Sequence, residues 1–274
     1  GVVTISLFPP QTWIWHSLAR VIAPSFDLVL AAFPEESECY GRSGVATEFV
    51  GHYLADVLAP RTPETRRSAR AALGLSMSEP VVALLPGSRA WEISRLLPVM
   101  LSATDLICAQ MPAVQMIAAL SEPRTADQHA PVRTPLGHSI RLTTDSHLTM
   151  HAADVLVSCS GTATLEASLI GTPMVVAYTA SRSTYAIIRA CIRVGLMPGD
   201  TVALPNLILG RHVVPEFIQR HVTAPALADA ALRLIPDGEP QRTQREALTA
   251  VRAHVARPDT LTTAARMIMA RVTR

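Results

Sequence analysis

The sequence contains a short turn whose residues could bind a phosphate group. The tetrapeptide Pro86-Gly87-Ser88-Arg89 follows an apolar run and precedes a segment with helical periodicity. Gly87 lets the backbone come close to a ligand, and Ser88 can cap the helix that follows. The free N–H groups of a first helical turn attract anions, and Arg89 would add charge-assisted hydrogen bonds. An ordinary turn with a solvated arginine is the alternative.

A second turn of small residues stands in the same position after another apolar run. It consists of Ser160, Gly161 and Thr162, and Glu166 follows one turn into the next helical segment. Hydroxyl groups and free backbone donors suit a diphosphate, and a carboxylate at that spacing can bind a ribose diol. Together the two turns could hold a nucleotide diphosphate. The alternative is helix capping with close packing at Gly161.

A third segment, 204–219, places polar residues inside apolar sequence. Its polar side chains include Asn206, Arg211, Glu216 and Gln219. Buried polar groups must be paired, so this segment is either a loop whose polar groups satisfy one another or a wall of a ligand site. Composition leaves both interpretations open.

Apolar runs alternate along the chain with segments of helical periodicity. The runs do not alternate with polar residues, which is typical of strands buried on both faces of a parallel sheet. The pattern predicts a doubly wound α/β fold, in which ligands bind at the carboxyl ends of the strands. It also predicts a linker over 55–66 and helices alone after residue 222. The predicted strands are 2–8, 26–33, 80–86, 113–120, 153–159 and 173–178, and the predicted helices are 63–74, 88–110, 143–151, 161–170 and 181–195.

Composition limits the chemistry of these 274 residues. All 24 basic Lys+Arg positions are arginine, which excludes mechanisms that need a lysine amine in this sequence. A net charge of +2 gives no reason to expect nucleic acid binding. Neither a C-x-x-C pair nor a carboxylate cluster occurs, so we expect no metal site and no disulfide framework. No apolar run has the length of a membrane-spanning helix. The four cysteines are Cys39, Cys108, Cys159 and Cys191.

One predicted helix could lie on a membrane surface. On a helical wheel, Arg182, Arg189 and Arg193 fall close together, and an apolar stripe of Tyr185, Ile188 and Ile192 adjoins them. Such a helix can lie in an anionic bilayer interface. The arginine-rich tail over 241–274 could favour the same surface or a phosphate-bearing substrate. A helix that faces the core, with a solvated arginine edge, is the alternative.

Five segments, in their order along the chain, resemble the lipid-A-disaccharide synthase family. These inverting glycosyltransferases have the GT-B arrangement of two Rossmann-like domains. The pairing of PGSR-x-x-EI-x-RLLP with PNLILGR-x-VVPEF-x-Q is the specific part of the resemblance. The matching segments are PPQTWIW (9–15), FVGHYLAD (49–56), LLPGSRAWEISRLLP (84–98), SGTATLEASLIGTPMVVAY (160–178) and LPNLILGRHVVPEFIQ (204–219).

The resemblance implies three segments with different roles. Residues 1–58 would be the C-terminal part of the acceptor-side Rossmann-like domain, and 59–235 the UDP-sugar donor-binding domain with a parallel sheet. Residues 236–274 would form C-terminal helices that pack back across the domains.

The resemblance also implies a reaction and a set of donor contacts. The reaction joins UDP-2,3-diacylglucosamine to 2,3-diacylglucosamine 1-phosphate and releases UDP. Arg89 would contact the donor diphosphate, with Gly87 and Ser88 shaping its turn, and Glu166 would bind the ribose. Arginine and helix dipoles would stabilise the leaving UDP, with no metal or other cofactor. Further donor contacts would come from Ser160, Gly161, Thr162, Asn206 and Gln219.

The resemblance further implies a peripheral protein on the cytoplasmic face of the bacterial inner membrane. Its partners there would be the two acylated sugars and an anionic lipid surface. Nucleic acid is not among the expected partners, and a homodimer is left open.

The sequence departs from the family pattern in two places. His16 stands where the family has an arginine after its W-x-W. The family's G-E-x-S-G-D turn and D-x-P-x-F-N segment, which holds the expected base, do not occur in these residues. An inverting displacement needs a base near the acceptor oxygen. We therefore assign no catalytic residue, expect the base upstream of Gly1, and expect this chain to bind UDP-sugar but to catalyse poorly.

Two other functions fit the same residues. Another UDP-sugar glycosyltransferase or epimerase with this fold would bind its nucleotide in the same way. A non-catalytic module that binds nucleotide-sugar or lipid is the alternative from a different class.

Overall fold

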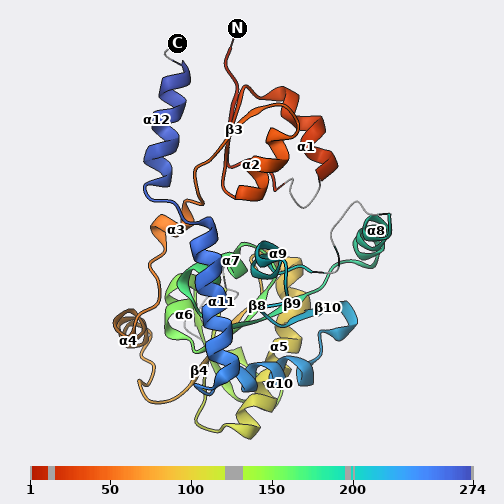
Figure 1. Cartoon of the computed structure of the whole chain (residues 1–274). Coiled ribbons are helices and arrows are strands. Elements are labelled where there is room, and N and C mark those ends of the chain that lie inside the picture. The colour runs from red at the N-terminus through yellow and green to blue at the C-terminus, as the bar shows by residue number, and fades with distance from the viewer. Residues whose placement is uncertain (1, 12–15, 121–131, 195–198, 200, 273–274) are drawn as a thin grey trace. The chain divides into compact units, whose positions relative to one another are not determined.

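The computed structural model describes residues 2–11, 16–120, 132–194, 199 and 201–272, which fold as two compact units (Figure 1). The first unit comprises 1–59, 181–200 and 252–274, and the second comprises 60–180 and 201–251. The W-x-W segment 13–15 lies outside the described residues. The functional domains expected at 1–58, 59–235 and 236–274 stay a prediction.

The first unit is built on a three-stranded parallel sheet. Its strands lie in the order β1 (Ile5–Leu7), β2 (Leu28–Ala31) and β3 (Ala46–Phe49). Successive residues of a strand point to opposite faces. Val29 accordingly packs with α1 (His16–Ile22) and α2 (Pro34–Gly41). Leu28 and Leu30 pack on the other face with α12 (Thr260–Val272). The unit also contains α3 (Leu54–Val57) and α8 (Arg182–Arg193).

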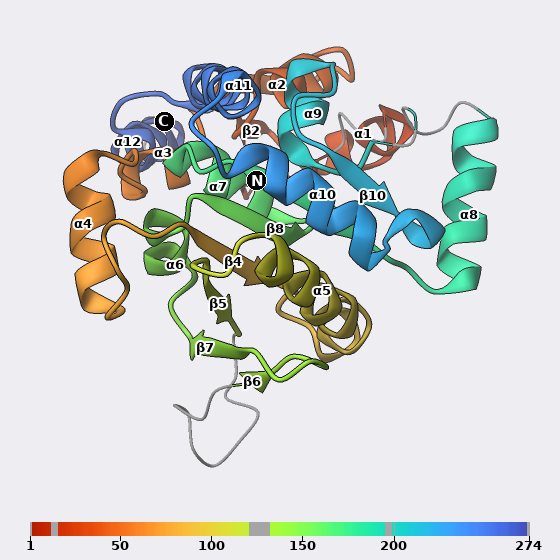
Figure 2. The same cartoon turned by 90° about the horizontal axis from the view of Figure 1, so that it is seen from below.

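The second unit is built on a seven-stranded sheet in the order β10-β9-β8-β4-β5-β7-β6. Figure 2 shows β8, β4, β5, β7 and β6 following one another across this sheet. All neighbouring strands are parallel except the β6–β7 pair, which is antiparallel. The strands are β4 (Val81–Leu85), β5 (Gln115–Ala119), β6 (Val132–Arg133), β7 (Ser139–Thr143), β8 (Val155–Cys159), β9 (Met174–Tyr178) and β10 (Glu216–Ile218).

Helices cover both faces of the larger sheet. The apolar side chains of α5 and α10 form one hydrophobic cluster with β4, β8 and β9, and α6 and α7 pack against the same central strands. Every residue of β4 and β8 is buried, which explains why these strands are apolar without alternation. No helix in the described ranges has the length and apolar character needed to cross a bilayer. The helices are α4 (Pro63–Ala72), α5 (Ala90–Gln110), α6 (Ser146–Ala152), α7 (Thr162–Ile170), α9 (Leu204–Leu209), α10 (Ala224–Leu234) and α11 (Glu239–Val255).

The boundary between the two units falls between Ala59 and Pro60, inside the predicted linker, which the structure narrows. The predicted linker 55–66 overlaps the end of α3 and the start of α4, so only 58–62 is irregular. Pro63 occupies the first turn of α4, and the Thr62 hydroxyl accepts a hydrogen bond from the Thr65 N–H. Proline in a first turn begins a helix because its missing N–H has no intrahelical partner there.

The six predicted strands and five predicted helices all occur, but four strands were missed. β3 is short and partly exposed, and β10 lies at a sheet edge within the polar segment 204–219. β6 has only two residues and lies at the opposite edge, and β7 beside it is partly exposed. Strands that are very short or partly exposed lack the continuous apolar run by which most of the others were identified.

A buried ionic cluster joins the amino ends of β4 and β8. Asp154 immediately precedes β8, and its carboxylate accepts a hydrogen bond from the Val81 N–H at 3.0 Å. The same carboxylate contacts Arg61 at 3.2 Å, Arg66 at 2.9 Å and Arg70 at 2.6 Å. Burial opposes its ionisation, but the Val81 hydrogen bond and the three guanidinium charges outweigh burial and lower the pKa of Asp154.

We predict that Asp154→Asn destabilises the protein by about 3–5 kcal/mol, because it leaves buried guanidinium groups without their counter-charge. The measurement is urea unfolding followed by circular dichroism. The lowered pKa of Asp154 adds a pH signature. The ionised Asp154 contributes to the free energy of unfolding above its ordinary pKa, and this contribution is lost as the pH falls through the lowered pKa of the folded state. The free energy of unfolding of the variant should not show this decrease at acidic pH.

The matched control for this experiment is Glu38→Gln. Glu38 pairs with Arg42 on the exposed surface of α2, and such pairs contribute less than about 1 kcal/mol. Equal destabilisation by the two substitutions would contradict the role assigned to Asp154.

Candidate functional site

The two predicted turns lie at the same edge of the larger sheet. They follow β4 and β8, which are adjacent and parallel, with Leu85 in register with Ser158 near the carboxyl ends. The helices that begin after the turns, α5 and α7, therefore both start at this edge. The backbone N–H groups at the start of each helix lie at this edge.

The first turn is held by a carboxylate that sequence analysis did not assign. Gly87 has a φ of 118°, which favours glycine. The Glu92 carboxylate accepts hydrogen bonds from the N–H groups of Ser88 at 3.3 Å and Arg89 at 3.2 Å. It also pairs with the Arg89 guanidinium at 3.0 Å. A glutamate three residues after a helix cap is the sequence signal that could have identified this contact.

The second turn requires glycine because of its backbone conformation and not because a larger side chain would clash with a neighbour. Gly161 has a φ of 140°, and a Cβ built there would meet no atom within 4 Å. The alternative of close packing at Gly161 is therefore wrong. The Ser160 hydroxyl donates a 2.6 Å hydrogen bond to the Val202 carbonyl, and Thr164 donates to the Gly161 carbonyl at 2.7 Å. These bonds fix the turn where α7 begins.

A cavity of about 400 Å³ lies between the two turns. Its far wall comes from Leu120 after β5 and from Thr144, Ser146 and Met150 at the start of α6. The structure thus brings most of the predicted donor contacts to one cavity. The predicted residues that line it are Gly87, Ser88, Arg89, Ser160, Gly161, Thr162 and Glu166.

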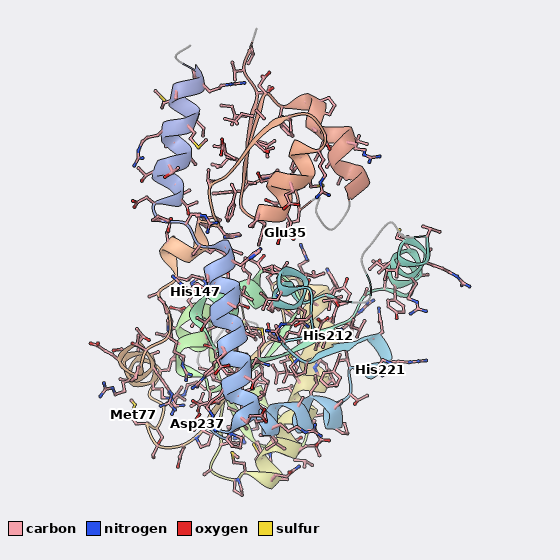
Figure 3. The ribbon with its side chains drawn as sticks, in the orientation of Figure 1. Glu35, Met77, His147, His212, His221 and Asp237 are labelled. Carbon is pink, nitrogen blue, oxygen red and sulfur yellow. The ribbon has the colours of Figure 1, made fainter. Side chains whose placement is uncertain are left out.

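The charged side chains that line the cavity are Arg89, Glu92 and Glu166. Arg89 is 70% exposed, whereas Glu92 is 13% exposed. His147 of α6, labelled in Figure 3, places its Nε2 3.5 Å from the Glu166 carboxylate. A site with one arginine and two carboxylates would bind an anion through the N–H groups of α5 and α7 as well as through Arg89.

Asn206 does not line this cavity and has buried partners of its own. Its amide oxygen accepts hydrogen bonds from the N–H groups of Val213 at 2.6 Å and Val214 at 2.9 Å. Its amide nitrogen donates to the Val214 carbonyl at 2.9 Å and to the Glu216 carboxylate. Glu216 in turn accepts from the Val202 N–H at 2.7 Å. All of these partners of Asn206 lie within the segment 204–219, which forms α9, a connecting loop and β10.

Gln219 also lies outside the residues that line the cavity. Its side-chain amide donates to the Ala180 carbonyl at 3.3 Å, and its backbone has a φ of 55°. Contacts of Asn206 and Gln219 with a donor stay a prediction. No catalytic base is assigned.

Comparison with known protein families gives one match over most of the chain. The family model described as lipid-A-disaccharide synthetase matches residues 3–266. A lipid-A-disaccharide synthase of Xylella fastidiosa is 40% identical over 234 residues, which are 84% of this chain and 60% of that protein. One of Paraburkholderia xenovorans is 37% identical over 271 residues, which are 98% of this chain and 68% of that protein. The chain thus spans 60% of the length of the first relative.

Solved structures show the same fold. The UDP-GlcNAc 2-epimerase from Neisseria meningitidis, bound to UDP-GlcNAc, has a TM-score of 0.59 and 12% identity, over 97% of this chain and 68% of that chain. A variant of the wall teichoic acid polymerase TagF has a TM-score of 0.51 and 13% identity, over 88% and 56%. At these identities the likeness concerns the fold alone, and the predicted α/β fold class of GT-B type is confirmed.

The cavity contains a thiol that we predict to be unreactive. Burial raises the pKa of Cys159 to about 12, and the charge of Glu92 adds to this effect. At pH 8 its thiolate fraction is therefore roughly a thousandfold below that of an ordinary cysteine. Iodoacetamide should label Cys191, which lies half-buried on α8, long before Cys159 in a time course followed by peptide mass spectrometry. Equal labelling rates would contradict this environment for Cys159.

Proposed function

This chain belongs to the lipid-A-disaccharide synthase family, and we propose that it binds the UDP-sugar donor of that family's reaction in the cavity between its two turns. The donor would be UDP-2,3-diacylglucosamine, and the acceptor 2,3-diacylglucosamine 1-phosphate. The reaction forms the lipid A disaccharide 1-phosphate and releases UDP. One observation carries the proposal: the turns before α5 and α7, together with Arg89, line one cavity at the carboxyl edge of the sheet.

The diphosphate would lie between the starts of α5 and α7. Its oxygens would accept hydrogen bonds from backbone N–H groups of the two turns and from the Arg89 guanidinium. The same groups would stabilise the charge that develops on UDP as the glycosidic bond to it breaks.

The ribose would lie against Glu166. This carboxylate is one turn into α7 and lines the cavity, so it could accept hydrogen bonds from both hydroxyls of the diol. His147, at 3.5 Å, would restrict the carboxylate to one orientation. Thr144 and Ser146 on the facing wall supply further polar groups at the level of the nucleoside.

Another UDP-sugar transferase or an epimerase would use the same nucleotide site, and so would a non-catalytic module. The chain's membership of the family, and the two sequence segments that are specific to this family, favour the acylated donor over other UDP-sugars. Comparing UDP-N-acetylglucosamine with the acylated donor would separate these functions, because acyl recognition is needed only for the lipid substrate.

We predict that Arg89→Ala weakens the binding of UDP about 10- to 100-fold, as expected for the loss of a charge-assisted contact. The measurement is isothermal titration calorimetry on the folded chain. The matched control is Arg95→Ala, because Arg95 is exposed on the same helix and lies over the Trp91 ring. The control should bind UDP as the wild type does. Absence of UDP binding by the wild type, or equal affinities for all three proteins, would overturn the proposed donor site.

We further propose that the protein associates with the anionic inner-membrane surface on its cytoplasmic side, with α8 as the contact. No described side chain of α8 is fully buried, which argues against a helix that faces the core. The stripe residues Tyr185, Ile188 and Ile192 are half-buried, and Arg189 and Arg193, which adjoin them on the helical wheel, are exposed. Apolar and basic residues together suit an anionic bilayer interface. A homodimer stays a prediction.

We predict that Ile188→Glu, on the apolar stripe of α8, reduces cosedimentation with vesicles of phosphatidylglycerol and phosphatidylethanolamine at least threefold, because a charge replaces apolar area that would enter the interface. Leu136→Glu is the control, since Leu136 is an exposed apolar residue that lies between β6 and β7. It should leave vesicle binding unchanged. Equal losses in the two variants, or no binding by the wild type, would contradict a role for α8.

A further inference from the structure

We infer that Glu92 competes with the donor's diphosphate for the same hydrogen-bond donors, so that it selectively weakens the binding of phosphorylated ligands. The inference rests on the proposed function, because it concerns an anion bound in that cavity. It assigns to Glu92 an effect on which ligands bind, in addition to its role in capping α5.

The contacts of Glu92 are the ones that a diphosphate would need. One carboxylate oxygen lies 3.3 Å from the Ser88 N–H nitrogen and 3.2 Å from that of Arg89. The other oxygen lies 3.0 Å from Nη1 of Arg89. Glu92 therefore engages both backbone donors of the first turn and its guanidinium. A phosphate oxygen could use these donors fully only if the carboxylate releases or shares them.

Glu92 also occupies the space that the glycine turn leaves open. A Cβ built on Gly87 would lie 2.6 Å from a Glu92 carboxylate oxygen. The carboxylate thus sits directly against the backbone where Gly87 would let a phosphate approach. Because Glu92 lies within this cavity wall and is only 13% exposed, solvent screens its charge less than that of a surface glutamate.

The negative charge of Glu92 acts on two titratable groups at the ends of neighbouring strands. Burial raises the pKa of Cys159, at the end of β8, and Glu92 raises it further. Burial likewise raises the pKa of Tyr178, at the end of β9, with Glu92 as the second cause. A field that disfavours a thiolate and a phenolate also disfavours a diphosphate in the same region.

Capping alone predicts a different outcome from competition. If Glu92 only holds the turn and orients Arg89, its neutral replacement loosens the site and weakens the binding of UDP. If Glu92 competes with the diphosphate, the same replacement frees donors and removes a repulsion, so UDP binds more tightly. Uridine has no phosphate and should be insensitive to the competition. The ratio of the two affinities therefore distinguishes the two roles.

The test is calorimetric titration of UDP and uridine into the wild type and Glu92→Gln. We expect the variant to bind UDP about 3- to 30-fold more tightly, in line with removal of one partly screened like charge. Its affinity for uridine should change less than twofold. Glu64→Gln is the matched control, since Glu64 is an exposed acidic residue in the first turn of α4, and it should leave both affinities unchanged.

A second neutral variant, Glu92→Ser, keeps the test decisive if Glu92→Gln does not fold, because it also removes the charge and its shorter side chain leaves the backbone donors of the turn to the ligand. It should show the same selective gain for UDP. Unchanged or weaker UDP binding by a folded neutral variant, with UDP still bound by the wild type, overturns this inference and leaves the proposed function standing. Absence of UDP binding by the wild type overturns both.

Discussion

The arrangement of the site depends on the way Asp154 joins the amino ends of two neighbouring strands. Its carboxylate accepts from the Val81 N–H, and its own N–H donates to the Val81 carbonyl at 2.8 Å. These two bonds set β8 beside β4 in one register, with Val82 opposite Val155. A shift of one residue would turn the side chains of a strand to the opposite face. The register fixed at one end therefore determines how the turns meet at the other.

The charges at the two ends of these strands are balanced differently. At the amino ends, three arginines surround one carboxylate that is fully ionised. At the carboxyl ends, Arg89 and two carboxylates, Glu92 and Glu166, line one cavity. The first arrangement makes the fold depend on Asp154, because losing this carboxylate would leave buried guanidinium groups without a counter-charge. The second places backbone donors, one arginine and two carboxylates around a cavity, which suits the proposed binding of an anion.

Much of the fold and part of the site could be predicted from the sequence. Strands buried on both faces, such as β4 and β8, carry a continuous apolar run, and the glycine turns that follow them mark the cavity edge. The partners of Asn206 could not be predicted, since they lie seven to ten residues away in a loop whose shape the pattern does not specify. The orientation of Glu92 toward the turn depends on the geometry of the helix start, which the family motif does not specify. The arginine content of the sequence does not indicate which arginines are buried, so it could not distinguish the fully buried Arg70 from the exposed Arg89.

The central claim is that both turns bind one diphosphate, and amide chemical shifts measured during a titration with UDP test it most directly. In a ¹⁵N-labelled sample, the amide signals of Ser88, Arg89, Gly161 and Thr162 should shift together and saturate at one UDP concentration. Uridine should move these signals far less than UDP does. Shifts confined to one turn, or shifts at other positions with both turns unaffected, would contradict the account.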